Sequence, residues 1–170
     1  MHVIAVVALV MTMLSWVVPG VQAQDACDGM DTYEHDLIEA SRDYGQWLIE
    51  ERFSERDPAT FSAKEWREAS QRAEEMQTGL KAIEPPPGVA DWHNLQIDAS
   101  GLQSSFSLSA ASTGFITAAL AMQEQFADIE TRREETRDAA ISACPDFADV
   151  FAAWDALDQN TATPVASPTP

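Results

Sequence analysis

The sequence predicts an all-α protein: an antiparallel up-down-up-down four-helix bundle followed by a short fifth helix. Three observations lead to this prediction. Apolar residues recur at steps of three and four along most of the chain, which is the spacing of one face of a helix. Pro85, Pro86 and Pro87 interrupt this pattern once, and the pair Thr113 and Gly114 interrupts it again. Short breaks between amphipathic helices make the flanking helices antiparallel neighbours.

The expected helices follow from these breaks and from local start signals. Asp31 is typical of the residue that caps the first helix. Ser62 and Glu65 form an S-x-x-E capping box at the start of the second helix, and Phe61 and Trp66 occupy the hydrophobic staple positions around it. We expect helices at residues 31–54, 63–83, 89–111, 115–143 and 147–157.

The break at Thr113 and Gly114 decides the topology. Residues 109–114 contain no large side chain, and the apolar pattern restarts at Phe115. An uninterrupted helix over residues 89–143 would be about 80 Å long at 1.5 Å per residue, and no other part of the chain is long enough to cover it. We therefore expect a turn here, with one long helix as the alternative.

The chain has two cysteines, Cys27 and Cys144. In an up-down-up-down bundle the start of the first helix lies beside the end of the fourth, so we expect the two cysteines to form a disulfide. A disulfide that closes so long a loop is worth on the order of 4–5 kcal/mol in the loop-entropy model. The alternative is that Cys27 is a lipid-bearing N-terminus, although the residues before it match the usual lipidation sequence poorly.

Residues 1–23 are expected to be a signal peptide. Residues 3–18 form an apolar, uncharged run too short for an ordinary membrane span, and a small-residue cleavage signal ends at Ala23. An uncleaved anchor is the alternative, because no lysine or arginine precedes the apolar run. Residues 24–158 would then form the bundle domain, and residues 159–170, rich in Thr, Ser and Pro, a disordered tail. We expect a secreted or extracytoplasmic protein without a membrane span in its mature form.

The mature chain is strongly acidic. The sequence contains 28 acidic and 10 basic residues, and its net charge is −18 at pH 7. Such a surface repels nucleic acid and anionic lipid, so no nucleic-acid partner is expected. The acidic residues are spread along the expected helix faces, which favours a role in solubility.

Residues 80–84, the three prolines that follow, and Trp92 with His93 at the next helix start form a pattern that ends at Cys144. This pattern resembles a loose group of small exported bacterial α-helical proteins of unassigned activity. It covers roughly residues 65–144. The resemblance implies export and a helical-hairpin architecture, and it implies no catalytic residue.

The chain lacks the common enzyme signatures: no G-x-S-x-G, H-E-x-x-H, P-loop or G-x-G-x-x-G motif is present. We therefore expect a non-enzymatic protein that uses no cofactor. One polar constellation remains at the disulfide end of the expected bundle, where imidazole and carboxylate groups would suit a small molecule, zinc or copper. His35 and His93 are expected to face solvent, however, and no metal site is predicted. The candidate ligand-binding residues are His35, Glu84, Asp91 and His93.

Three further features have two interpretations each. Gly45 weakens the first helix by roughly 1 kcal/mol relative to alanine, or it marks a point of close packing. The fifth helix packs on the bundle, or it presents an apolar face with Trp154 to a partner. Serines of the third helix allow close helix packing, or they line a polar groove for a ligand. These serines are Ser100, Ser104, Ser105, Ser107 and Ser109.

The expected function is that of an exported non-enzymatic helical-bundle module that binds an unidentified protein or small-molecule partner. The alternative is a small-molecule or metal-ion binding protein that uses the polar site near His35 and His93. An exposed apolar patch on residues 147–157 would favour a protein partner. A closed pocket with converging polar groups would favour a small ligand.

Overall fold

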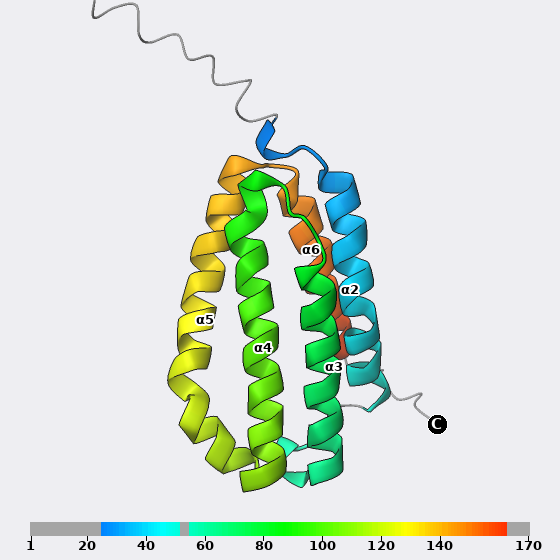
Figure 1. The fold of residues 1–170 in the computed structure, drawn as a ribbon, viewed down its shortest axis with the longest axis vertical. Coiled ribbons are helices and arrows are strands. Elements are labelled where there is room, and N and C mark those ends of the chain that lie inside the picture. The colour runs from blue at the N-terminus through cyan, green and yellow to red at the C-terminus, as the bar shows by residue number, and fades with distance from the viewer. Residues whose placement is uncertain (1–24, 52–54, 163–170) are drawn as a thin grey trace, which may run out of the picture.

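The computed structural model describes residues 25–51 and 55–162, with side chains described as far as residue 154. This part of the chain is helical and contains no strand, as predicted (Figure 1). The predicted signal peptide, residues 1–23, lies outside the described residues. The elements are α2 (Met30–Glu50), η1 (Pro58–Thr60), α3 (Ala63–Lys81), η2 (Pro87–Val89), α4 (Ala90–Thr113), α5 (Phe115–Ala143) and α6 (Phe147–Ala162).

The helices form the predicted antiparallel bundle (Figure 1). Helix α3 packs against α2 and α4, and α4 packs against α3 and α5. Helices α2 and α5 share few contacts with each other, whereas α6 packs against both of them. The fifth helix therefore forms one wall of the bundle, and it does not stand apart as a surface for display.

The start of α3 follows the prediction. Ser62 Oγ accepts a hydrogen bond from the N–H of Glu65 at 3.3 Å, and Glu65 Oε2 accepts one from the N–H of Ser62 at 2.6 Å. The ring centroids of Phe61 and Trp66 lie 5.3 Å apart. Arg56 also donates to Glu65, at 2.8 Å. This hydrogen bond and those from Ser62 lower the pKa of Glu65 to about 2.

Other helix ends differ from the prediction. Helix α2 begins at Met30, and its N-cap is Gly29, whose φ of 85° is a left-handed value that favours glycine. The prediction that Asp31 caps this helix is therefore wrong, because Asp31 lies within its first turn. Helix α6 runs to Ala162, beyond the predicted end at residue 157, and residues 163–170 lie outside the described part. The other bounds that differ from the predicted ones are the end of α2 at Glu50, the end of α3 at Lys81, and both ends of α4, at Ala90 and Thr113.

The chain turns back between α4 and α5 at Gly114, as predicted. Gly114 has a φ of 87°, and its N–H donates to the carbonyl of Ala110 at 2.9 Å, which closes the last turn of α4. Helix α5 then begins at Phe115. The alternative of one long helix over residues 89–143 is excluded.

The predicted disulfide joins Cys27 and Cys144, whose Cα atoms lie 5.4 Å apart. It links the segment before α2 to the residue that ends α5, across 117 positions of sequence. The chain is closely packed at this end, because a Cβ atom on Gly88 would come within 2.9 Å of the carbonyl oxygen of Ala26.

The buried apolar side chains form two clusters, which we call the disulfide-end core and the turn-end core. In the disulfide-end core the ring of Trp92 lies 5.0 Å from that of Phe147 and 5.9 Å from that of Trp154, between centroids. The turn-end core contains Trp47 and Trp66. Trp47, Trp66 and Trp92, which recur at the helical spacing of apolar residues, are buried. Trp154, which the sequence analysis allowed to be exposed to a partner, is buried as well.

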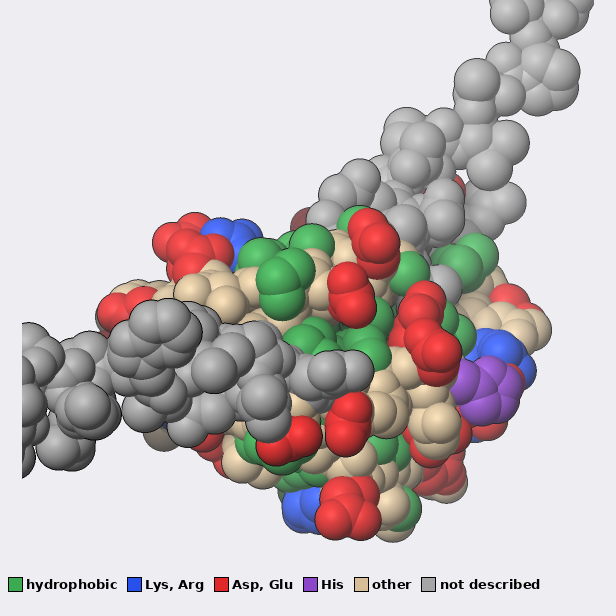
Figure 2. All heavy atoms as spheres, turned by 90° about the horizontal axis from the view of Figure 1, so that it is seen from above, with side chains coloured by type: hydrophobic (Ala, Val, Ile, Leu, Met, Phe, Trp, Pro, Cys, Tyr) green, Lys and Arg blue, Asp and Glu red, His purple; other side chains and the backbone are tan. Residues whose placement is uncertain are grey.

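Acidic side chains are dispersed over the surface. Figure 2 shows the end that carries the disulfide, where Asp and Glu lie at several separate places among hydrophobic and polar side chains. None of the described helices is long and apolar enough to cross a membrane.

Candidate functional site

His93, the central residue of the predicted polar site, is buried, with only 1% of its surface exposed. Its Nε2 atom lies 3.0 Å from the carbonyl oxygen of Leu80, which only accepts, so Nε2 carries the proton. Nδ1 then accepts a hydrogen bond from the hydroxyl of Tyr33 at 3.2 Å. Burial lowers the pKa of His93, so the ring is neutral. The prediction that His93 faces solvent is wrong, because this ring ties α2, α3 and α4 together.

The other three predicted site residues, His35, Glu84 and Asp91, are exposed. The structure therefore does not gather them with His93 into one site. Among the described residues no group of three or more His, Cys, Asp or Glu side chains is placed to hold a metal ion.

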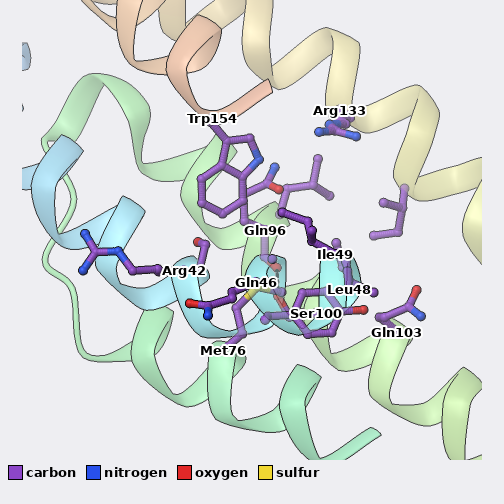
Figure 3. Close-up of a pocket in the computed structure, with 16 residues that line it drawn as sticks. Arg42, Gln46, Leu48, Ile49, Met76, Gln96, Ser100, Gln103, Arg133 and Trp154 are labelled. Atoms are coloured by element: carbon purple, nitrogen blue, oxygen red, sulfur yellow. Dashed lines mark hydrogen bonds between the residues drawn. The ribbon is translucent and has the colours of Figure 1, made fainter. Parts of the chain in front are cut away.

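A different feature is the candidate site: a pocket of about 430 Å³ that is lined by residues of all five helices and is partly open to solvent (Figure 3). Met76 in its wall packs on the disulfide-end core, and Tyr44 and Leu48 pack on the turn-end core. The pocket therefore occupies the space between the two cores. Its apolar walls include Leu48, Ile49, Met76, Leu95, Ala99 and Ile129.

Three neutral polar side chains are buried in the pocket wall: Ser41, Gln96 and Ser100. The hydroxyl of Ser41 donates to the carbonyl of Leu37 at 2.8 Å, and that of Ser100 donates to the carbonyl of Gln96 at 2.7 Å. Both serines thus use their protons within their own helices. The side-chain amide of Gln96, a residue only 7% exposed, forms no hydrogen bond with another described residue, but its atoms are not fully shut off from solvent.

The charged residues of the pocket wall are Arg42 and Arg133, and no Asp or Glu lines it among the described residues. This is unusual in a chain with 28 acidic and 10 basic residues. Arg42 forms an ion pair with Glu39 on its own helix, and its guanidinium extends away from the pocket (Figure 3). The permanent charge of the wall therefore lies at its edges.

Gly45 of α2 keeps part of the pocket open. A Cβ atom built at Gly45 would meet no atom within 4 Å, and Gly45 lines the pocket. The interpretation of Gly45 as a point of close packing is therefore wrong. A larger side chain here would project into free space.

No protein-family model, curated protein or solved structure matches this chain. Its function must be inferred from the pocket and from the sequence.

Sequence reasoning did not locate the pocket, although it named Ser100 among the serines that could line a polar groove, and two further signals of the pocket are present. One is Gly45 in the interior of an otherwise regular helix. The other is the run of polar residues Gln96, Ser100 and Gln103 on α4, at the four-then-three spacing of one helix face. A polar stripe of this kind usually indicates a solvent-exposed face, whereas here it borders a pocket that is partly open to solvent.

Proposed function

We propose that the protein is an exported, non-enzymatic binding protein that holds a small molecule in the pocket between its five helices. The observation that carries this proposal is the pocket itself, with its volume of about 430 Å³ and its largely apolar walls. Small-molecule sites are typically concave, measure about 300–1,000 Å³ and combine apolar walls with a few placed polar groups. Gln96, Ser41 and Ser100 supply those polar groups.

The composition of the pocket wall supports binding without catalysis. Hydroxyl groups are present on Ser41, Tyr44 and Ser100, but the described wall contains no His, Asp, Glu or Cys. A serine nucleophile needs a base beside it, and general acid–base catalysis needs a titratable group near the reacting atoms. The described lining places no such base beside its serines, and Tyr44 is the one residue in it of a type that serves as a general acid or base.

A protein partner that docks on α6 has less support. In the described part of α6 the apolar side chains of Phe147, Val150 and Trp154 are buried, being 0%, 3% and 8% exposed. These side chains are used in the disulfide-end core, so they present no patch to a partner.

Export is supported by two features of the chain. Residues 1–23 have the apolar run and the small-residue ending of a signal peptide. The disulfide between Cys27 and Cys144 is the kind of bond that persists in oxidising compartments outside the cytosol.

The proposal is tested with the oxidised protein of residues 24–170 and N-phenyl-1-naphthylamine, an uncharged aromatic probe that fluoresces more strongly in apolar surroundings. We expect saturable binding of one probe per chain, with a dissociation constant between about 1 µM and about 1 mM, as the size of the pocket allows.

A matched pair of variants at Gly45 locates the site. Gly45→Leu extends a side chain into the pocket and should abolish the fluorescence increase. Gly45→Ala adds the same helix-favouring Cβ atom but leaves most of the space free, so it should bind as the natural protein does. A probe that fails to bind, or that binds Gly45→Leu unchanged, would show that the pocket is not a ligand site.

A further inference from the structure

We infer that the ligand of this pocket is an uncharged amphiphile: a compact apolar body with one neutral hydrogen-bonding head, such as a hydroxyl or amide, that pairs with Gln96. This inference rests on the proposed function and adds the chemical class of the ligand. It is based on the unpartnered amide in the wall, on the charges around the pocket and on the pocket's size.

The amide of Gln96 is the decisive group. Gln96 lies on α4 and lines the pocket together with Trp154 of α6 on the facing wall (Figure 3). The residue is only 7% exposed, and its amide has no hydrogen-bond partner among the described residues. The amide atoms are not among the fully buried unpaired polar atoms, so they are reached from the partly open pocket, where they offer hydrogen bonds to a ligand group.

The neighbouring hydroxyls of Ser41 and Ser100 determine which hydrogen bonds that ligand group can form. Ser41 and Ser100 already donate their protons to backbone carbonyls, so they offer only acceptor lone pairs to the pocket. Gln96 offers both N–H donors and a carbonyl acceptor. A head that donates one hydrogen bond and accepts another satisfies this set, as a hydroxyl or an amide does.

The charges around the pocket disfavour an ionised head. A cationic head would find no carboxylate in the described wall. An anionic head would meet a protein of net charge −18, while Arg42 points away toward Glu39 and Arg133 already has an interaction partner. Burying an ion without a counter-ion is costly, whereas a neutral head needs only hydrogen bonds.

The volume sets the size of the ligand. A pocket of about 430 Å³ equals the liquid volume of roughly 14 water molecules at about 30 Å³ each. A ligand of roughly 10–20 non-hydrogen atoms therefore fits, and both N-phenyl-1-naphthylamine and a straight decyl chain with a small head lie within this range.

The test compares three ligands that share a decyl chain: n-decanol, decanoate and decyltrimethylammonium. The two ions are titrated below their micelle concentrations, and n-decanol below its solubility limit, against the oxidised protein loaded with N-phenyl-1-naphthylamine at constant ionic strength. We expect n-decanol to displace the probe with a dissociation constant at least about tenfold lower than either ion. Tighter or equal binding of decanoate or of the ammonium ion would overturn the inference. If the probe binds in the pocket and only the order of heads is different, the proposed function stands and this inference fails.

Variants of Gln96 test the role of the amide. Gln96→Leu and Gln96→Met replace it with apolar side chains of similar length, so at least one of them should keep the fold. We expect each to weaken n-decanol binding by about tenfold and to change probe binding by less than about twofold, because the pocket keeps its shape. Undiminished n-decanol binding by both variants would overturn the pairing with Gln96. Failure of every ligand and of the probe to bind the natural protein would overturn the proposed function as well.

Discussion

Similar polar residues on two sides of α4 have different surroundings: on one side they are hydrogen-bonded to a neighbouring helix, and on the other they line the pocket. On the side that faces α3, Ser104 donates to Glu74 at 3.1 Å and lies 3.0 Å from the hydroxyl of Ser70, so its polar group is paired across the helix interface. On the side that faces the pocket, Ser100 bonds only to its own helix and Gln96 has no side-chain partner among the described residues. We call these the paired side and the pocket side.

The difference shows that a small polar residue in a helix bundle pairs with a neighbouring helix or borders a pocket according to which groups the facing helices bring within reach. Across the paired side α3 brings matching groups within reach, including the amide of Gln77, which donates to the carbonyl of Ile97 at 3.0 Å. Across the pocket side α2 and α5 share few contacts, and α6 spans the distance between them. The space that remains is the pocket. The following predictions test this contrast, from the largest expected effect to the smallest.

The largest effect should come from removing the disulfide, which joins the segment before α2 to the end of α5. Replacing both cysteines, Cys27→Ala with Cys144→Ala, should lower the free energy of unfolding by about 2–5 kcal/mol, because the unfolded chain gains the freedom that the loop closure removes. Urea denaturation measures the change. Reduction of the natural protein should give a similar loss, and an unchanged urea midpoint after complete reduction would contradict the prediction.

Leucine substitutions at the two serines compare the sides directly. Ser104→Leu removes the hydrogen bonds to Ser70 and Glu74 and adds volume to a packed interface, so it should destabilise the fold by about 1–3 kcal/mol. Ser100→Leu adds the same side chain beside free space and should leave stability within about 0.5 kcal/mol while weakening probe binding. Equal losses of stability in urea denaturation would show that the two sides are equally packed.

The buried histidine should make stability depend on pH. Burial lowers the pKa of His93 below the value of about 6.5 for an unfolded histidine. The unfolded chain therefore binds a proton that the folded chain excludes, so stability is complete above about pH 6.5 and falls as the pH drops toward the folded pKa. The slope for this single proton is at most about 1.4 kcal/mol per pH unit.

A pair of histidine variants isolates this contribution. Urea denaturation at about pH 7.5 and about pH 5.5 should show a smaller pH dependence in His93→Phe than in the natural protein. His35→Ala removes an exposed histidine and should leave the pH dependence unchanged. If both variants keep the full pH dependence, the carboxylates and not His93 control it.

The sequence predicted much more of the fold than of the site, for a physical reason. Apolar periodicity identifies side chains that must leave water, and Trp92, Leu95 and Phe106, which recur at its spacing, are buried. It is blind to polar residues that are buried because neighbouring helices surround them, such as His93 and Gln96. Helix α4 packs on both sides, so burial extends beyond its apolar stripe. The turn at Gly114 and the disulfide were predictable because conformation and spacing alone determine them.

The smallest expected effect compares two glycines within helices. Gly45 borders the pocket, where an added Cβ atom meets nothing within 4 Å, whereas a Cβ atom on Gly79 would lie 3.1 Å from that of Ala40 across the interface between α2 and α3. Gly45→Ala should gain the full helix preference of alanine, about 1 kcal/mol. Gly79→Ala should gain less, because Ala40 must move to admit the methyl group. Urea midpoints of the two variants measure the difference. A Gly79→Ala variant as stable as Gly45→Ala would mean that the α2–α3 interface is no tighter than the pocket wall, because the same methyl group would then fit equally well in both places.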